Sequence, residues 1–450
     1  MTRLSDTARR IAPLAWPVFV GQVSVLAFST VDTVLLARYG QADLSAFAIG
    51  ASTYITVFIG LMGVVLALGP VAGRLFGARD LAGAGAQLKQ TLWMAAFLSL
   101  AGSLLLLWPQ PFLALARATP EMADKVRGYL MVLALSLPAS LMFTCFRAFN
   151  TAVSRPKAVM VLQLGGLALK VPLSMLFING WAPIGLPALG VTGCAVATLC
   201  AMWAQALLGW LVLRHDRFYA PFMLRGWVGP DFASIRAQLR LGLPMGLAIV
   251  VEVSGFSFMA FLIARTDIGA VAGHQIAANL VSLLFMMPLA LSSAVTTLVA
   301  QAIGAGAALQ ARQTAWHGVS ITLAMAALMG GAAFLTRAPI VGLYTDDAAI
   351  AAAALPLVAW VALFHVADAA QTVAAFVLRA WHIATVPLLI YVTSLAGVGL
   401  GGGMWLQDQP WLPVGLAGAP AYWLAATVGV VLAGMLMCGF LAWVMQQKAR

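Results

Sequence analysis

Charged residues are scarce in this chain, where Asp, Glu, Lys and Arg together make up 9% of 450 residues. Hydrophobic residues, in contrast, make up 62%. About a quarter of the residues of a soluble globular domain are charged, so this composition excludes an ordinary soluble protein. It indicates an all-α polytopic membrane protein whose surroundings are the lipid bilayer.

Cysteine is also rare, and the four that occur, Cys145, Cys194, Cys200 and Cys438, all lie in apolar runs. None of them has the spacing of metal ligands, so we expect no disulfide framework and no thiolate metal centre. The sequence contains neither an H-E-x-x-H motif nor a P-loop. We therefore expect no resident cofactor, no direct use of ATP and no enzymatic activity.

The formal net charge of +11 does not indicate nucleic-acid binding, because the basic residues form no cluster interleaved with aromatic ones. They gather instead in the connectors between apolar segments. Connectors on one side of the membrane carry about three times as many Lys and Arg as those on the other. The sequence therefore predicts that both termini are cytoplasmic, and we expect a monomer.

Twelve apolar segments are long enough to span a bilayer, since a spanning helix needs about 20 mostly apolar residues. Their expected ranges are roughly 11–38, 44–74, 87–112, 122–150, 157–180, 186–213, 236–266, 268–302, 312–336, 348–381, 384–406 and 418–446. The longest polar stretch follows the sixth segment. We therefore predict an N-lobe of residues 1–213, a cytoplasmic linker of residues 214–235 and a C-lobe of residues 236–450.

The two halves of the chain resemble each other. A shift of 227 residues places Pro17 on Pro244 and Gly77 on Gly304. Each half then has an even number of spans, so both halves enter the membrane from the same side. This pattern predicts two six-helix lobes related by a pseudo-two-fold axis along the membrane normal.

Three carboxylates, Asp32, Glu252 and Asp368, lie inside the apolar segments. An acid in the hydrocarbon region is costly and usually binds a cation, relays a proton or pairs with another charge. The repeat places Met259, Val25 and Ser136 at the corresponding positions of the other half. Because the acids do not recur in both halves, we expect a function local to one lobe rather than an architectural role.

Glu252 and Asp368 fall near the middle of their segments and can share a Na⁺ ion or a proton. Neutral oxygen ligands for such a cation are available on Gln275, Asn279 and Gln371. The alternative interpretation is that each acid is hydrogen-bonded to its helix neighbours and serves packing alone.

Lys170 is the only cation deep inside a predicted span, and Asp32 is the only span-embedded acid of the first half. A buried Lys requires a counter-charge, so we hypothesise that the two side chains approach each other. The competing interpretation is that Lys170 extends to an interface.

Aromatic and Met side chains of the second half can line an adaptable substrate cavity. The candidates are Phe256, Met259, Phe285, Met286 and Phe364. The alternative is that they are core or lipid-facing residues.

Three stretches resemble signatures of the MATE (multidrug and toxic compound extrusion) transporters, most closely the NorM-type branch. They are VDTVLLARYGQADLSAFAIGAS at 31–52, GHQIAANLVSLLFMMPLALSSA at 273–294 and VADAAQTVAAFVLRAW at 366–381. The resemblance implies a V-shaped fold of two lobes that exports bulky, often cationic, drugs and dyes in exchange for Na⁺ or H⁺. It also implies that Asp32 is the acid of the first helix, and that Glu252 and Asp368 are the cation-site acids of the C-lobe.

Two positions depart from the family pattern. The family often has Asn residues in its fifth helix near the first-helix acid, whereas this chain has Lys170 and Ser174 there. Some relatives have a Tyr one turn before the tenth-helix acid, where this chain has Phe364. The first departure shifts the expected cation site toward the C-lobe pair.

The sequence thus predicts a secondary-active multidrug exporter of the bacterial inner membrane, with organic cations as substrates. One rival is a lipid-linked oligosaccharide flippase of related architecture, which requires a cationic cavity. A second rival is a membrane-embedded enzyme, for which the sequence offers no motif.

Overall fold

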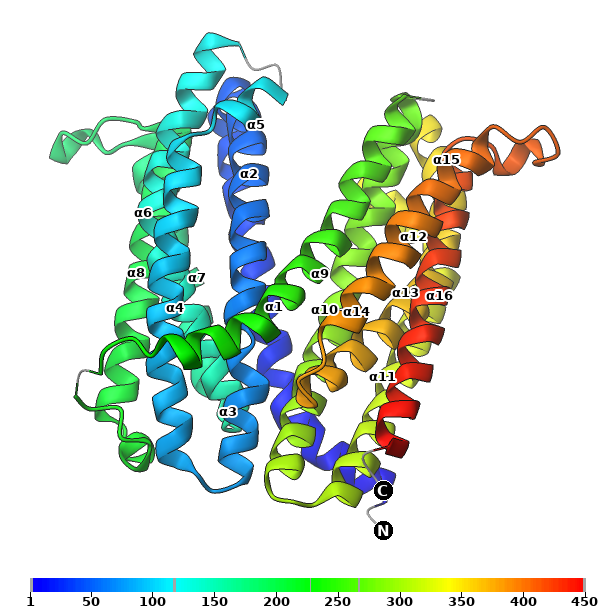
Figure 1. Cartoon of the computed structure of the whole chain (residues 1–450). Coiled ribbons are helices and arrows are strands. Elements are labelled where there is room, and N and C mark those ends of the chain that lie inside the picture. The colour runs from blue at the N-terminus through cyan, green and yellow to red at the C-terminus, as the bar shows by residue number, and fades with distance from the viewer. Residues whose placement is uncertain (1–2, 116–118, 227, 266–267, 448–450) are drawn as a thin grey trace. The chain divides into compact units, whose positions relative to one another are not determined.

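The computed structural model describes residues 3–115, 119–226, 228–265 and 268–447, and these are almost entirely helical (Figure 1). Twelve of the described helices are long and apolar enough to cross a membrane, which confirms the predicted number and order of spans. The two chain ends, whose side of the membrane the sequence predicts, reach residues 1–2 and 448–450 and so lie outside the described residues.

The first six spans begin with α1 (Leu4–Tyr39) and a second span formed by α2 (Gln41–Val65) and α3 (Leu68–Gly77). They continue with α4 (Leu81–Leu107), α6 (Pro120–Ala152), α7 (Pro156–Asn179) and α8 (Gly190–His215). The short helices α5 (Gln110–Leu115), η1 (Ala182–Ile184) and η2 (Arg217–Phe222) lie in connectors.

The last six spans are α9 (Phe232–Ala264), α10 (Ile268–Gly304), α11 (Ala308–Leu335), α13 (Ala348–Ala380), a composite span and α16 (Ala419–Gln447). The composite span joins α14 (Thr385–Tyr391), the π-helical η3 (Val392–Gly401) and α15 (Gly402–Gln407). The connectors contain α12 (Arg337–Tyr344) and η4 (Val414–Leu416).

Side chains in the connectors cap several helices. Asp80 accepts a hydrogen bond from the backbone N–H of Gly83 at 2.8 Å at the start of α4. Asp347 accepts from the N–H groups of Ala349 at 2.7 Å and Ile350 at 3.2 Å at the start of α13. Such caps satisfy N–H groups that have no partner within the helix, so they fix where each span begins.

The helices form two compact units. One contains residues Trp16–Gly246 and the other contains Met1–Ala15 with Leu247–Arg450. In the first unit α6 packs against α2, α4 and α8, and in the second α13 packs against α10, α11 and α16. Since α6 and α13 are the fourth and tenth spans, the two units have equivalent central helices.

The boundaries of these units differ from those of the predicted lobes. The start of α1 up to Ala15 packs with the second unit, and the start of α9 up to Gly246 packs with the first. Part of the predicted linker is also held to α4, where Gln90 bonds the carbonyl of Gly229 at 3.1 Å and the N–H of Asp231 at 2.7 Å. The described residues of the predicted linker, 214–226 and 228–235, therefore belong to the first unit.

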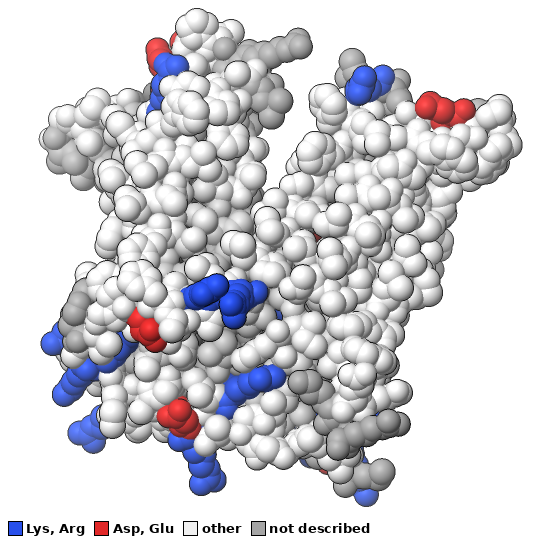
Figure 2. Space-filling view, viewed as in Figure 1, with Lys and Arg blue, Asp and Glu red and all other residues white. Residues whose placement is uncertain are grey.

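The long sides of both units are mostly free of charge on the face shown in Figure 2. Large apolar side chains are exposed on the described helices, among them Trp16, Leu100, Leu104 and Phe261. Exposed apolar surface of this extent marks contact with lipid rather than with water.

Candidate cation and substrate sites

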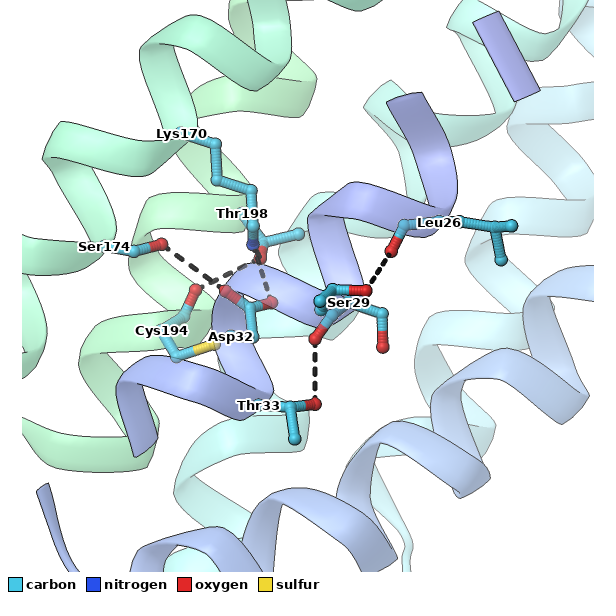
Figure 3. A network of polar contacts seen from close by, with 9 residues as sticks. Leu26, Ser29, Asp32, Thr33, Lys170, Ser174, Cys194 and Thr198 are labelled. Atoms are coloured by element: carbon cyan, nitrogen blue, oxygen red, sulfur yellow. Dashed lines mark hydrogen bonds and ion pairs between the residues drawn. The ribbon is translucent and has the colours of Figure 1, made fainter. Parts of the chain in front are cut away.

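Asp32 and Lys170 form a buried ion pair inside the first unit (Figure 3). The Lys170 Nζ lies 2.8 Å from Asp32 Oδ2. The side chain of Lys170 is 1% exposed, so it does not extend to an interface. The structure thus shows the hypothesised pair.

Other side chains also contact the two charged groups of this pair. Nζ of Lys170 also donates to Oγ1 of Thr198 at 2.5 Å and lies 5.3 Å from the centre of the Phe28 ring. The hydroxyl of Ser174 donates to Asp32 Oδ1 at 3.4 Å. An ammonium has three N–H donors, and here they have a carboxylate, a hydroxyl and an aromatic face as partners.

Helix periodicity explains how the sequence assembles this cluster. Residues four apart lie on the same face of a helix. α1 contributes Phe28 and Asp32 at that spacing, and α7 contributes Lys170 and Ser174. On α8, Thr198 donates its hydroxyl hydrogen to the carbonyl of Cys194 at 3.1 Å, which orients its oxygen lone pairs toward Lys170.

Glu252 and Asp368 meet in the second unit through the amide of Gln371. Nε2 of Gln371 donates to Asp368 Oδ1 at 2.8 Å and to Glu252 Oε1 at 3.3 Å. The two acceptor oxygens are therefore at most about 6 Å apart, where two carboxylates repel each other strongly. A cation or a proton between them would remove that repulsion, and the sharing of one by this pair stays a prediction.

No Lys or Arg of the described residues forms an ion pair with either of these acids. The guanidinium of Arg379, at the end of α13, attracts Glu252 from a longer distance and lies 4.0 Å from the centre of the Phe376 ring. The Oε1 atom of Gln371 and the hydroxyl of Thr372 are buried and contact no hydrogen-bonding group of the described chain. Oxygen atoms that can act as ligands thus remain available on these residues, which suits a hard cation such as Na⁺.

Two further predicted ligands, Gln275 and Asn279, lie on α10. Gln275 and Asn279 form no hydrogen bond to Glu252 or Asp368 within the described residues. Asn279 instead accepts a hydrogen bond from the hydroxyl of Tyr344 at 2.8 Å. Of the neutral ligands that the sequence suggested, Gln371 is the one that bonds the acids among the described residues, and the roles of Gln275 and Asn279 stay predictions.

The candidate cavity residues are distributed between the core and partly covered positions. Met259 and Phe364 are 2% and 4% exposed and belong to the apolar core of the second unit. Phe256 contacts Phe364 with 5.6 Å between ring centres. Phe285 and Met286 are half-buried on α10. Their role in binding substrate stays a prediction.

Nothing in the sequence indicated roles for Thr198, Phe28 and Trp423. Trp423 on α16 is fully buried and contacts the rings of Phe256 and Phe364 at inclined angles, with 6.2 Å and 5.9 Å between ring centres. Each residue is of an ordinary type for a membrane helix, and its importance lies only in contacts with other helices. Spacing along one helix therefore carried no signal for them.

A helical membrane protein with two equivalent units and buried acids in both is characteristic of secondary transporters rather than of enzymes. The MatE family model matches residues 17–176 and again residues 244–405, and the chain belongs to that family of transporters. The two matches begin at the positions that the predicted repeat superimposes, which confirms the repeat.

Two curated relatives match nearly the whole chain. The "Probable multidrug resistance protein NorM" of Aromatoleum aromaticum is 37% identical over 98% of this chain and 95% of that protein. The "Multidrug resistance protein PmpM" of Pseudomonas aeruginosa is 34% identical over 97% of this chain and 91% of its own length.

Solved structures agree on the fold. The crystal structure of the eukaryotic MATE transporter AtDTX14 superimposes with a TM-score of 0.88 at 18% identity and covers 99% of both chains. A MOP superfamily transporter from Pyrococcus furiosus, whose title describes a binding pocket of reversed polarity and suggests a different function, has a TM-score of 0.87 at 16% identity. It covers 99% of this chain and 97% of its own. These likenesses establish the fold alone, because function depends on the site.

Proposed function

We propose that this chain exports organic drugs and dyes, many of them cationic, across the bacterial inner membrane in exchange for Na⁺ or H⁺. The names of the relatives support multidrug export, and the Glu252–Asp368 pair supports cation coupling. The excess of Lys and Arg on one side supports a cytoplasmic location of both termini.

The observation that carries the proposal is that one amide bridges two acids which have no ion-pair partner among the described residues. When both acids are charged, the N–H groups of Gln371 stabilise them. When a cation enters, it binds between the carboxylates, and a half-turn of the amide presents Oε1 as a further ligand. Inward flow of the cation thus changes the charge and the hydrogen bonding of α9 and α13 together.

Coupling follows from differential affinity. A cation shifts a conformational equilibrium only as far as it binds one state more tightly than the other. Because Glu252 and Asp368 lie on different helices, any motion that separates α9 from α13 weakens the shared site. Cation binding therefore favours the state in which these helices remain together.

The proposal is tested by measuring ethidium efflux from proteoliposomes with a Na⁺ gradient or a pH gradient imposed separately. Efflux driven by Na⁺ alone identifies a Na⁺ site, and efflux driven by pH alone identifies a proton carrier. Export that dissipates when the gradient is collapsed supports exchange. Absence of efflux under both gradients contradicts the proposal and favours the flippase, which is then tested by binding of isoprenoid pyrophosphates.

A further inference from the structure

The groups around Lys170 are those of a cation site. The cation that they surround is the ammonium of Lys170 itself. Asp32 Oδ2 and the Thr198 hydroxyl meet at one point beside the Phe28 ring, and Ser174 donates to the other oxygen of the same carboxylate. These are groups that suit a monovalent cation. The ammonium of Lys170 lies at that point (Figure 3).

We propose that Lys170 is a tethered cation that permanently occupies the cation site of the first unit. Consequently only the second unit exchanges cations with the solution. The inference deepens the proposed function and rests on cation coupling at Glu252 and Asp368. Lys170 acts here as a positioning residue, since it sets the charge state of Asp32 rather than contacting the substrate.

Charge balance leads to this assignment. Asp32 and Lys170 are 5% and 1% exposed and carry opposite charges, so the cluster is neutral as a whole. A free cation that approached Asp32 would meet the ammonium 2.8 Å from the same carboxylate. Like charges repel strongly where water is excluded, so a second cation does not bind while Lys170 is present.

The donor atoms lead to a further consequence. Removal of the ammonium leaves Asp32 uncompensated in a buried position, with Ser174 still bonded to Asp32 Oδ1 and the Thr198 hydroxyl still oriented by the carbonyl of Cys194. An isolated buried carboxylate is costly and is stabilised by any cation that can reach it. Lys170→Ala therefore creates a site for a free monovalent cation where the native chain has none.

The experiment is equilibrium binding of radioactive Na⁺ to the purified full-length chain in detergent. We expect Lys170→Ala to bind one additional Na⁺ per chain, and Asp32→Asn/Lys170→Ala to bind as many as the native protein. Lys170→Arg, which keeps the charge, serves as the matched control and should show no gain. A merely structural lysine would lower stability without adding an Asp32-dependent site.

Two results would overturn the proposal. One is a folded, monodisperse Lys170→Ala protein that gains no Na⁺ site. The other is a loss of binding in Asp32→Asn/Lys170→Ala relative to the native chain, since Asp32 would then bind Na⁺ natively. If Lys170→Ala does not fold, the neutral double variant still decides the second point, because it leaves no uncompensated charge.

Failure of the proposed function is distinguished by the efflux assay, in which neither a Na⁺ gradient nor a pH gradient then drives export. The absence of a Na⁺ site in the second unit gives another pattern. If Glu252 and Asp368 bind no Na⁺, the native protein shows no binding that Glu252→Gln or Asp368→Asn removes. The gain in Lys170→Ala is still expected in that case, because its ligands lie in the other unit. A gain that persists in Lys170→Ala/Glu252→Gln supports the tethered cation independently of coupling.

Discussion

Both units of the chain contain buried acid, but they balance its charge differently. In the first unit Asp32 has a lysine 2.8 Å away and two hydroxyl neighbours in the same cluster. In the second unit Glu252 and Asp368 share one neutral amide. The first unit thus balances its buried carboxylate with its own lysine. The acid pair of the second unit requires a cation or a proton from outside the protein.

Buried polar atoms that lack a protein partner are also distributed unevenly between the two units. Among the described residues, the buried side-chain polar atoms that lack a protein partner lie almost all in the second unit. Thr296 on α10 and Gln371 and Thr372 on α13 are examples, and these two helices pack against each other. Only Ser136 belongs to the first unit. Buried polar groups normally bond to protein or to ordered water, so the second unit has the buried groups that can bind an ion, water or another polar ligand.

The strongest test of this contrast is to neutralise the acids of the second unit. Glu252→Gln and Asp368→Asn should each abolish gradient-driven efflux, because either change removes one of the two charges that attract the cation. Neither should lower thermal stability, since each removes repulsion between two carboxylates. Ethidium efflux from proteoliposomes and unfolding in detergent are the two measurements.

Asp346→Asn provides the matched control, because Asp346 is an exposed acid in a connector of the same unit. It should leave efflux unchanged. Near-native efflux in both Glu252→Gln and Asp368→Asn would rule out the acid pair as the coupling site.

In the first unit, by contrast, removal of one buried charge should lower the stability of the protein. Lys170→Met and Asp32→Asn each leave a buried charge without its partner, which costs about 3–5 kcal/mol of folding free energy. The double variant Asp32→Asn/Lys170→Met should recover most of that loss. Thermal unfolding of the four proteins in detergent gives the coupling free energy, and purely additive losses would show that the pair does not act as a unit.

The sequence predicted the twelve spans from composition, the repeat from residues that match at a nearly constant offset, and the Asp32–Lys170 pair from two rare charges. Hydrocarbon admits few charges, so the only deep cation and the only deep acid of one half could be matched. Thr198 and the bridging role of Gln371 depend on which helix faces meet. Neutral residues such as Gln275, Asn279 and Gln371 are equally suitable ligands by type, and only the packing of α10 and α13 separates them.

That separation provides a third test. Gln371→Leu removes a hydrogen-bond donor from two acids and a potential oxygen ligand from the cation. A hydrogen bond to a charged group contributes about 1.5–3 kcal/mol, so the cation concentration for half-maximal efflux should change by about tenfold or more. Gln275→Leu is the control of identical chemistry on α10 and should change nothing. Equal effects of both variants would contradict the assignment of Gln371 to the site.

The smallest effect is expected at an ion pair outside the spans of the first unit. Arg155 Nη1 lies 2.7 Å from Asp216 Oδ2, and the Phe218 N–H donates to Asp216 Oδ1 at 2.9 Å. Both side chains of the pair are more than a third exposed, at 37% and 38%. Asp216→Asn keeps an acceptor for Phe218 and loses the ion pair, so it should cost less than about 1 kcal/mol.

The stability that Asp216→Asn loses should depend on pH. The Phe218 N–H, and secondarily the Arg155 guanidinium, lower the pKa of Asp216 below its ordinary value. A carboxylate with a lowered pKa contributes stability that is complete above the ordinary pKa and is lost as the pH falls through the folded-state pKa. The difference in unfolding between the native chain and Asp216→Asn should therefore be constant from about pH 8 to about pH 5, and should shrink only below about pH 4. A loss as large as that of Lys170→Met would mean that burial does not separate the two ion pairs, because solvent screening is the reason for expecting the exposed one to contribute several-fold less.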